Sequence, residues 1–425
     1  MGNAQSSGKL LFPTREKGLE ACFSSSQQAV EVIKGNQYTS YVLSGFSILG
    51  EDEQIRSERE LVQQRLRNKL LDPKEDRALG CMLGNAIGDA LGAPLEFSPV
   101  RYNTLELKGF DHAEIWQKPN YNRFMLKPGQ WTDDFSMALC LADSLLVKQD
   151  FNALDLRTRF VNWWYLGYCN AFGFSPDLSD RERSSVGLGG NISMSMTEFL
   201  EDPTIEFTQT GDKSTSGNGS VMRHSPVPVM FHDDRNKAMS VAHAQSKTTH
   251  QGEEAAELCR LLAFITVNAI NRADSKKDVL EDLSEFQTDL YSVQCLCKSM
   301  KEEKHESNAH LDLEDRNWNW KDPNFEFCKT RAKQQPGYVG SYAMDAVAMA
   351  LHCVYTTDNF VDALLKSANM RGDSDSYTAV TGSLCGAIYG SSSIPLSWVD
   401  VLQQFDRNGD IALKAYKLYH KQFNL

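Results

Sequence analysis

The sequence predicts an all-α domain, and three observations support that prediction. From Ala78 onward apolar residues recur mainly at helical spacing, while the alternation that is typical of strands is scarce. The chain has 425 residues, of which 41% are apolar and 24% are charged, as in folded globular proteins. The third observation is a stripe with glycine at every fourth position, which suits close helix packing: Gly80, Gly84, Gly88 and Gly92.

The helices are expected in a definite order along the chain. Residues 51–70 carry many charges around apolar positions at helical spacing and predict an amphipathic helix that leads into the main domain. Further helices are predicted at the following places: from Ala78, from Met137, and over residues 253–270, 343–354 and 378–389.

We expect two parts in the chain. Residues 1–70 are predicted to form an N-terminal extension that is partly disordered and has the amphipathic helix near its end. Residues 71–425 are predicted to form one domain. The charged stretch at about 272–336 indicates helices with a surface insertion inside that domain, and not a catalytic centre.

Charge and cysteine content exclude several classes of protein. The net charge of −12, with no strongly basic stretch to offset it, argues against nucleic-acid binding. Ten cysteines without regular spacing, and no secretory signal, indicate reduced thiols and a cytoplasmic location. No apolar run approaches the length of a membrane span. We expect a monomer.

The first six residues, Met-Gly-Asn-Ala-Gln-Ser, fit the N-myristoylation pattern of a second glycine and a sixth serine. One acyl chain anchors a protein only weakly, so acylation of Gly2 would give weak peripheral membrane association. The alternative is a disordered polar tail that matches a short pattern.

Two acidic clusters about 240 residues apart carry most of the chemistry that the sequence indicates. Residues 131–134 are Trp-Thr-Asp-Asp, and residues 371–376 are Arg-Gly-Asp-Ser-Asp-Ser. Each cluster offers two carboxylates and a hydroxyl within one helical turn, and such hard oxygen ligands suit small divalent cations.

Each cluster alone has a purely structural alternative. Thr132 is a good helix N-cap, and Asp373 or Ser374 could cap the helix predicted over residues 378–389. The combination favours a metal site. Adjacent carboxylates at Asp133 and Asp134 point about 100° apart on a helix, so each can serve a different ion. Four close carboxylates are unfavourable without cations, because like charges raise one another's pKa.

A glycine-containing loop over residues 214–223 runs into a predicted helix. Backbone N–H groups at such a junction bind phosphate well, although Gly-Asn-Gly is often only a turn. His250 precedes another predicted helix, and a lone histidine there is often a cap or packing residue.

With these segments in order, the chain resembles the ADP-ribosylglycohydrolase family, which includes dinitrogenase-reductase-activating glycohydrolases and ADP-ribosyl-acceptor hydrolases. The resemblance covers about residues 76–391 and rests on five motifs: residues 84–97, 129–137, 216–223, 249–250 and 371–390. It implies a single orthogonal multi-helix bundle with two Mg²⁺ or Mn²⁺ ions in a cleft.

Carried over position by position, the resemblance assigns the site residues. Those that match metal ligands are Thr132, Asp133, Asp134, Asp373, Asp375 and Ser376. Those that match the pyrophosphate-binding loop are Gly217, Asn218, Gly219 and Ser220. His250 matches a histidine near the distal ribose or the phosphates, and Glu96 matches a glutamate at the edge of the cleft.

The expected reaction cleaves the bond at the anomeric carbon of an ADP-ribosyl group through an oxocarbenium-like transition state. Asp134 is our first choice for the carboxylate that acts as base, and Asp373 is the second. Glu96 is expected to protonate or position the leaving group.

Four positions depart from the family pattern. Ser376 stands where many members have threonine, Arg371 where glycine is frequent, and Tyr377 where the residue is often small or polar. Gly187 takes the place of an aspartate found in the nitrogenase-reductase type, which puts arginine specificity in question.

The leading hypothesis is a metal-dependent hydrolase that removes ADP-ribose from arginine or serine side chains of proteins. One alternative is hydrolysis of a free metabolite such as O-acetyl-ADP-ribose. A second alternative is a catalytically silent protein that binds ADP-ribose or is structural, and a third is a metal phosphoesterase, which would release phosphate or AMP. The six oxygen ligands argue against a silent protein.

Overall fold

The computed structural model describes residues 23, 25–35, 43–98, 106–118, 120–172, 185–272, 278–281, 283, 285–325 and 338–425. The myristoylation pattern at Gly2 and most of the region predicted to be disordered lie outside the described residues. Within the described ranges the chain forms helices and turns, and its extended segments form only isolated β-bridges. The prediction of an all-α fold is confirmed.

The helices of the described residues occur in the following order: α2 (Ser26–Gly35), α3 (Glu53–Arg67), α4 (Pro73–Gly92), η1 (Ala93–Leu95), α5 (Ala113–Gln117), α6 (Asp133–Lys148), α7 (Ala153–Leu166), α9 (Gly190–Glu201), η2 (Asn218–Ser220), α10 (Pro226–Met230), α11 (Arg235–Lys247), α12 (Glu253–Asn271), α13 (Asp278–Glu281), α14 (Tyr291–Cys297), η3 (Glu306–Asn308), α15 (Ala343–Tyr355), α16 (Phe360–Asn369), α17 (Ser374–Tyr389), η5 (Ser391–Ser393), α18 (Leu396–Gln403), η6 (Arg407–Gly409) and α19 (Asp410–His420). Three helices begin a turn or more earlier than the sequence predicted: α4 at Pro73, α6 at Asp133 and α17 at Ser374.

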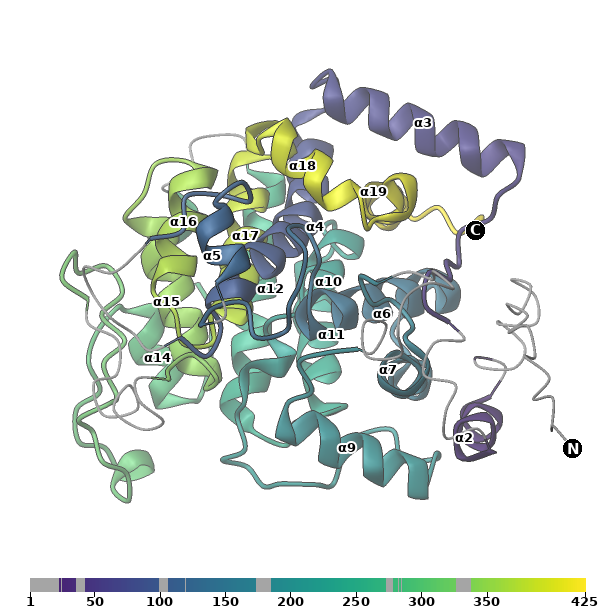
Figure 1. The fold of residues 1–425 in the computed structure, drawn as a ribbon. Helices are drawn as coiled ribbons and strands as arrows, with labels where there is room; N and C mark the ends of the chain where they lie inside the picture. Colours follow the sequence, from purple (N-terminus) through teal and green to yellow (C-terminus); the bar gives the residue numbers. More distant parts are fainter. Residues whose placement is uncertain are drawn as a thin grey trace, which may run out of the picture.

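Helices α4 and α17 form the centre of the molecule, and the other helices surround them (Figure 1). The capping box of Asp72 and Glu75 and the proline at the first helical position start α4. Beyond its first turn α4 is buried on all sides, as is α17 up to Ile388. A helix that is buried all round belongs to the core of a large domain.

The glycine stripe explains how α4 and α17 pack. A Cβ atom at Gly84 would overlap the carbonyl oxygen of Gly382, and one at Gly80 would overlap that of Gly386. Near the end of α4, a Cβ at Gly92 would overlap the carbonyl oxygen of Ser374. The two backbones are therefore in direct contact along the length of the stripe, which only glycine permits.

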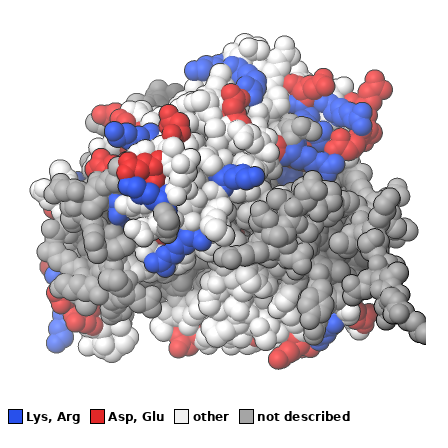
Figure 2. Space-filling view, in the orientation of Figure 1, with Lys and Arg blue, Asp and Glu red and all other residues white. Residues whose placement is uncertain are grey.

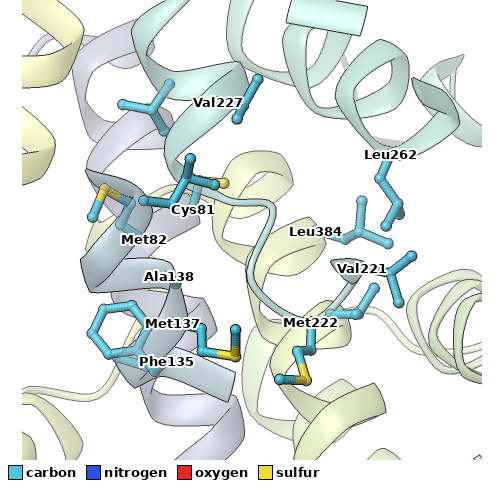
Figure 3. Close-up of a cluster of buried hydrophobic side chains, with 14 of the residues drawn as sticks. Cys81, Met82, Phe135, Met137, Ala138, Val221, Met222, Val227, Leu262 and Leu384 are labelled. Atoms are coloured by element: carbon cyan, nitrogen blue, oxygen red, sulfur yellow. The ribbon is translucent and has the colours of Figure 1, made fainter. Parts of the chain in front are cut away.

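A cluster of buried apolar side chains lies where α4 and α17 meet neighbouring helices (Figure 3). Cys81 and Met82 come from α4, Phe135 and Met137 from α6, and Leu384 from α17, and all five are buried. The cluster fixes the relative positions of α4, α6 and α17, whose polar ends carry the acidic motifs.

The helix predicted over residues 51–70 is present as α3, which packs on α19 at the edge of the molecule (Figure 1). The buried Arg59 donates to Asp410 with an Nε–Oδ1 distance of 2.9 Å, and Lys417 pairs with Glu58. On the face drawn in Figure 2, basic and acidic side chains of the described residues are intermixed. None of the helices in the described ranges has the length and apolar character that a membrane crossing requires.

Replacing Gly84 by alanine is expected to destabilise the protein, although alanine is the better helix former. The new methyl group would meet the backbone of Gly382, which cannot rotate away, so we expect a loss of about 3 kcal/mol or more. Thermal unfolding measures the effect. Gly35→Ala is the matched control, because nothing lies within 4 Å of a Cβ at that exposed end of α2. A melting temperature of Gly84→Ala equal to that of the wild type would contradict this packing.

Candidate functional site

The two acidic clusters converge at the starts of two helices. Thr132 is the N-cap residue of α6, and Asp133 and Asp134 form its first turn. Asp373 is the N-cap residue of α17, and Asp375 lies in its first turn. The glycine stripe brings the start of α17 against the end of α4, and Ser374 Oγ donates to the carbonyl oxygen of Gly92 at 2.8 Å.

A further acidic residue, Asp89 of α4, organises the start of α6. Its carboxylate accepts hydrogen bonds from the Thr132 N–H at 3.0 Å, from Thr132 Oγ1 at 2.9 Å and from the Phe135 N–H at 2.8 Å. Because the side chain of Asp89 is fully buried, these bonds hold residues 132–135 in a fixed place on α4.

Thr132 and Ser376 place hydroxyl oxygens among the carboxylates. Thr132 Oγ1 lies 3.2 Å from Asp134 Oδ2 and 3.3 Å from Asp375 Oδ2. The Ser376 side chain is hydrogen-bonded to Asp134, and the Ser376 N–H donates to Asp375 Oδ1 at 2.9 Å. Residues from both clusters therefore share one buried centre, as the sequence predicted.

The segment that follows α4 adds Glu96 to this centre. Residue 96 forms a parallel β-bridge with Gly372, the Phe97 N–H donates to the Gly372 carbonyl at 2.9 Å, and the Gly372 N–H donates to the Ser98 carbonyl at 3.1 Å. This pairing sets Glu96 beside Asp373. Asp373 Oδ2 in turn accepts a hydrogen bond from Asn218 Nδ2 at 3.1 Å.

The helix-capping alternatives are wrong for both clusters. Thr132 and Asp373 occupy the N-cap positions, but neither side chain accepts a hydrogen bond from its helix. The Thr132 hydroxyl is directed to Asp89, the Asp373 carboxylate accepts from Asn218, and Ser374 bonds to Gly92. The side chains at these helix starts therefore form hydrogen bonds to other segments of the chain and do not cap their own helices.

Burial and mutual repulsion perturb the carboxyl groups. Burial, followed by the charge of Asp375, raises the pKa of Asp89 to about 8. Burial is also the main cause that raises the pKa of Glu96, Asp133, Asp134 and Asp375 well above the ordinary range, and neighbouring carboxylates add to the effect. Without a cation, burial and mutual repulsion therefore favour the protonated forms of these carboxyl groups.

The donor set fits divalent cations. Asp89, Asp134 and Asp375 each offer an oxygen within 4.8 Å of the others, and so do Glu96, Asp373 and Asp375. Asp134 Oδ1 and Glu96 Oε2 are buried and have no hydrogen-bond donor among the described residues. Buried carboxylate oxygens without a donor are costly unless a cation or ligand meets them. Asp375 belongs to both groups, so the two sets of oxygen atoms adjoin each other.

A pocket of about 480 Å³ opens onto this centre. The residues that line it come from the acidic centre, the glycine-containing loop, the start of α9 and an aromatic group: Glu96, Phe97, Phe124, Asp133, Asp134, Gly187, Leu188, Gly189, Gly190, Asn191, Ile192, Gly217, Asn218, Gly219, Met222, His250, Tyr338, Ser341, Asp373, Asp375 and Ser376. Thr132 does not line the pocket, because it lies beneath the carboxylates at 1% exposure.

The glycine-containing loop forms another wall of the pocket. A Cβ at Gly219 would lie 2.8 Å from Ile192 Cδ1 and 3.1 Å from His250 Cε1, so the loop leaves no room for a side chain there. Burial, together with the charge of Arg223, lowers the pKa of His250 to about 3, which keeps the imidazole neutral. Arg223 donates to the Gly219 carbonyl at 2.9 Å and anchors the loop from below.

Ser220 differs from the expectation that it joins the phosphate-binding loop. It is fully buried, it does not line the pocket, and its Oγ accepts a hydrogen bond from Ser246 Oγ at 2.8 Å. The tight turn of η2 directs its side chain into the core, so Gly217, Asn218, Gly219 and His250 remain as the loop residues that face the pocket.

Two departures from the family pattern have structural reasons. Arg371 has φ of +63°, a left-handed conformation that favours glycine, and its guanidinium lies 5.4 Å from the ring centroid of Tyr121. Gly187 has φ of +88°, and a Cβ there would overlap the carboxylate of Asp133. A side chain at position 187 would therefore displace Asp133 from its present place.

The sequence prediction missed several residues at the site, among them Asp89, Phe97 and Tyr338. Asp89 lay within a motif used for the resemblance, and its signal was a lone carboxylate in an otherwise apolar helical stretch. Phe97 and Tyr338 carry no comparable signal, because aromatic residues are usual in protein cores.

Comparisons with known proteins agree with this geometry. The family model described as ADP-ribosylglycohydrolase matches residues 71–424. The chain is 30% identical over 325 residues to the ADP-ribosylarginine hydrolase Tri1 of Pseudomonas putida (strain GB-1), covering 76% of this chain and 74% of that protein. It is 28% identical over 341 residues to the ADP-ribosylarginine hydrolase Tri1 of Serratia proteamaculans (strain 568), covering 80% and 79%. A solved structure of an ADP-ribosylglycohydrolase-related protein complex matches with a TM-score of 0.58 at 27% identity, covering 82% of this chain and 100% of that one.

Magnesium is expected to stabilise the protein more at pH 8 than at pH 5. A carboxyl group whose pKa is raised by folding stabilises the folded protein while the group is protonated. This stabilisation is lost as the pH rises from the unfolded pKa, about 4, to the folded pKa, which is about 8 for Asp89. In chelator the melting temperature should therefore fall over that range. Mg²⁺ competes with the protons, so its stabilising effect, about 2.7 kcal/mol at 100 times its Kd, should grow with pH.

The difference between melting temperatures with Mg²⁺ and with chelator is the quantity to measure. Asp406 has its pKa raised by burial to about 8 as well, but it lies away from the pocket residues, so Asp406→Asn is the matched control. A magnesium effect that is constant or decreases with pH would contradict a cation site at the carboxylates.

Proposed function

Because the chain belongs to the ADP-ribosylglycohydrolase family, we propose that it is a hydrolase that cleaves the glycosidic bond between ADP-ribose and a protein side chain. The observation that carries this proposal is the joining of both acidic clusters in one pocket with the glycine-containing loop. We further propose two Mg²⁺ or Mn²⁺ ions, held by the following residues: Thr132, Asp133, Asp134, Asp373, Asp375 and Ser376.

The residues of the pocket suit the parts of an ADP-ribosyl group. When bound, divalent cations supply positive charge that fixes the vicinal hydroxyls of the ribose beside the carboxylates. The loop over residues 217–219 accommodates the pyrophosphate, because Gly217 and Gly219 carry no side chain and the Asn218 side chain is held by the Gly340 carbonyl and Asp373. The neutral His250 can donate one hydrogen bond to the same region.

We assign a different catalytic role to each of three carboxyl groups. Asp134 has a buried oxygen without a hydrogen-bond donor and acts as the base that takes a proton from the attacking water. Glu96 stands at the edge of the centre and protonates or positions the leaving group, which its raised pKa permits. Asp373 is held by Asn218 and is the second choice for the base.

Arginine is the acceptor that the relatives favour, since both Tri1 proteins are named ADP-ribosylarginine hydrolases. Serine is the second acceptor. A free metabolite such as O-acetyl-ADP-ribose remains the alternative substrate, and a silent ADP-ribose-binding protein remains the alternative outside enzymes. We propose a cytoplasmic monomer, with weak membrane association if Gly2 is myristoylated.

Single substitution of Asp134 or Asp375 by asparagine is expected to abolish release of ADP-ribose. Each change keeps the side-chain volume but removes a charge from the centre that two clusters share. Peptides ADP-ribosylated on arginine or on serine are the substrates, and free ADP-ribose is quantified with and without chelator. Asp233→Asn is the control, because that exposed carboxylate pairs with Lys421 at the surface and does not line the pocket.

The product distinguishes the alternatives. Intact ADP-ribose supports the glycohydrolase, whereas AMP or phosphate would indicate a phosphoesterase. Calorimetric binding of ADP-ribose without turnover of any ADP-ribosylated substrate would indicate the silent protein. Full activity of either variant would refute the assigned roles.

A further inference from the structure

The charged insertion, which the sequence predicted at the surface, is joined to the rest of the domain by one buried arginine. Arg316 is 8% exposed, and its guanidinium donates hydrogen bonds to three side chains. Nε lies 2.8 Å from Glu302 Oε1 within the insertion, and Nη2 lies 2.6 Å from Glu254 Oε1 in the first turn of α12. Nη1 lies 2.7 Å from the hydroxyl oxygen of Tyr342, just before α15. We name Glu254, Glu302, Arg316 and Tyr342 the Arg316 network.

The hydrogen bonds of the Arg316 network define one arrangement of its side chains. The Tyr342 hydroxyl accepts from Arg316 and donates to Glu254 Oε2. Burial, followed by the charge of Glu254, raises the pKa of Tyr342, so the hydroxyl keeps its proton and remains a donor. Glu302 accepts a second hydrogen bond from the indole Nε1 of Trp318 at 2.7 Å. Every side chain of the network is therefore held by two or more hydrogen bonds.

The backbone of Tyr342 is paired with the loop expected to bind pyrophosphate. Residue 342 forms an antiparallel β-bridge with Gly217. Beside this bridge the Asn218 N–H donates to the Ser341 carbonyl at 2.9 Å, and the Asn218 side chain donates to the Gly340 carbonyl at 2.9 Å. Gly217, Asn218 and Ser341 line the pocket at the acidic centre. A shift of Tyr342 would therefore move one wall of that pocket.

Hydrogen bonds, more than packing, fix the side chain of Tyr342. It borders a second hollow of about 580 Å³, which Glu254 and Arg316 also line, and it does not line the pocket at the acidic centre. A side chain beside a hollow has fewer packing contacts than one in the core, so the bonds of its hydroxyl are the main constraint on its position. Buried ion pairs add little net stability, because desolvation offsets their attraction, and they serve better to specify one arrangement. The Arg316 network suits that role.

We propose that Arg316 is a positioning residue, which acts through Tyr342 to hold the loop over residues 217–219 in the form that receives the pyrophosphate of an ADP-ribosyl group. The proposal rests on the proposed function and deepens it, because it assigns part of the substrate affinity to the insertion. None of the described residues of the insertion, 278–281, 283 and 285–325, lines the pocket at the acidic centre, so their influence on the substrate passes through Tyr342. The pyrophosphate is common to all ADP-ribosyl substrates, so the effect is the same for arginine and serine as acceptors.

Two variants of the full chain test the proposal. Tyr342→Phe removes the hydroxyl and leaves the ring and the backbone bridge, whereas Arg316→Lys keeps the charge but lacks the fork that reaches three partners. Calorimetry with ADP-ribose and Mg²⁺ should show a Kd raised about threefold to tenfold in Tyr342→Phe, the effect of losing one hydrogen bond, and at least as much in Arg316→Lys. For ADP-ribosylated peptides that the wild type cleaves, KM should rise by the same factor while kcat changes little. The reason is that the pyrophosphate is bound alike in the ground state and in the transition state.

Two controls separate positioning from general stability. Tyr355→Phe is the matched control, because it removes a tyrosine hydroxyl that also bonds to a glutamate, Glu281, but lines neither pocket. Trp320→Phe removes the hydrogen bond from a buried indole to the Leu296 carbonyl inside the insertion. It should lower the melting temperature and leave the Kd of ADP-ribose unchanged.

The outcomes distinguish this proposal from the proposed function. An unchanged Kd of ADP-ribose in Tyr342→Phe would overturn the positioning role, as would a lower kcat at unchanged KM. An equal rise of the Kd in Trp320→Phe would also overturn it, because the effect would then follow stability. If the wild type binds ADP-ribose but releases it from neither the arginine nor the serine peptide, the proposed hydrolase fails, and a raised Kd in Tyr342→Phe would still support the positioning role. If the wild type does not bind ADP-ribose, both proposals fail.

Discussion

The direct backbone contact between α4 and α17 is the constraint on which the site depends. Glycines 80, 84, 88 and 92 leave α4 without side chains on one face, and the carbonyl groups of α17 occupy that space. The contact ends with Gly92 against Ser374, so the first turn of α17 is fixed beside the end of α4. Asp89, on the same final turns of α4, fixes the start of α6 through its bonds to residues 132–135. One helix thereby places both acidic clusters.

This arrangement brings the carboxylates of both clusters and of Asp89 together in a buried place. Their mutual repulsion opposes folding unless positive charge or hydrogen-bond donors offset it. The positive ends of the α6 and α17 dipoles lie at the carboxylates and offset part of the repulsion. Hydrogen bonds from Thr132, Ser376 and Asn218 offset another part. Burial and the neighbouring carboxylates still raise the pKa of Asp89, Asp134 and Asp375, so these contributions offset only part of the repulsion. Cations would complete the compensation, and the cost of the centre in the metal-free protein is the physical basis of its affinity for them.

Much of this could be predicted from sequence because the signals were local. The glycine spacing predicted close packing of α4, and the clusters around Asp133 and Asp375 predicted one shared centre. Other features depend on contacts that sequence does not encode locally. Whether the Thr132 hydroxyl caps its helix or faces Asp89 is decided by how α4 lies against α6. Ser220 points into the core because of the turn of η2. The pairing of Phe97 with Tyr338 joins segments 241 residues apart through the strand-like contact at Gly372.

The glycine at position 187 bears on how an acceptor can be recognised. In the nitrogenase-reductase type of the family the matching segment carries an aspartate, whereas here a Cβ at this position would overlap the carboxylate of Asp133. The backbone of residue 187 therefore lies against the acidic centre and brings no carboxylate of its own. An acidic partner for a cationic acceptor must come from another segment, and Glu96 provides a buried oxygen that no described donor meets. Residue 187 therefore contributes backbone alone, and the carboxylates at the pocket come from Glu96 and the acidic centre.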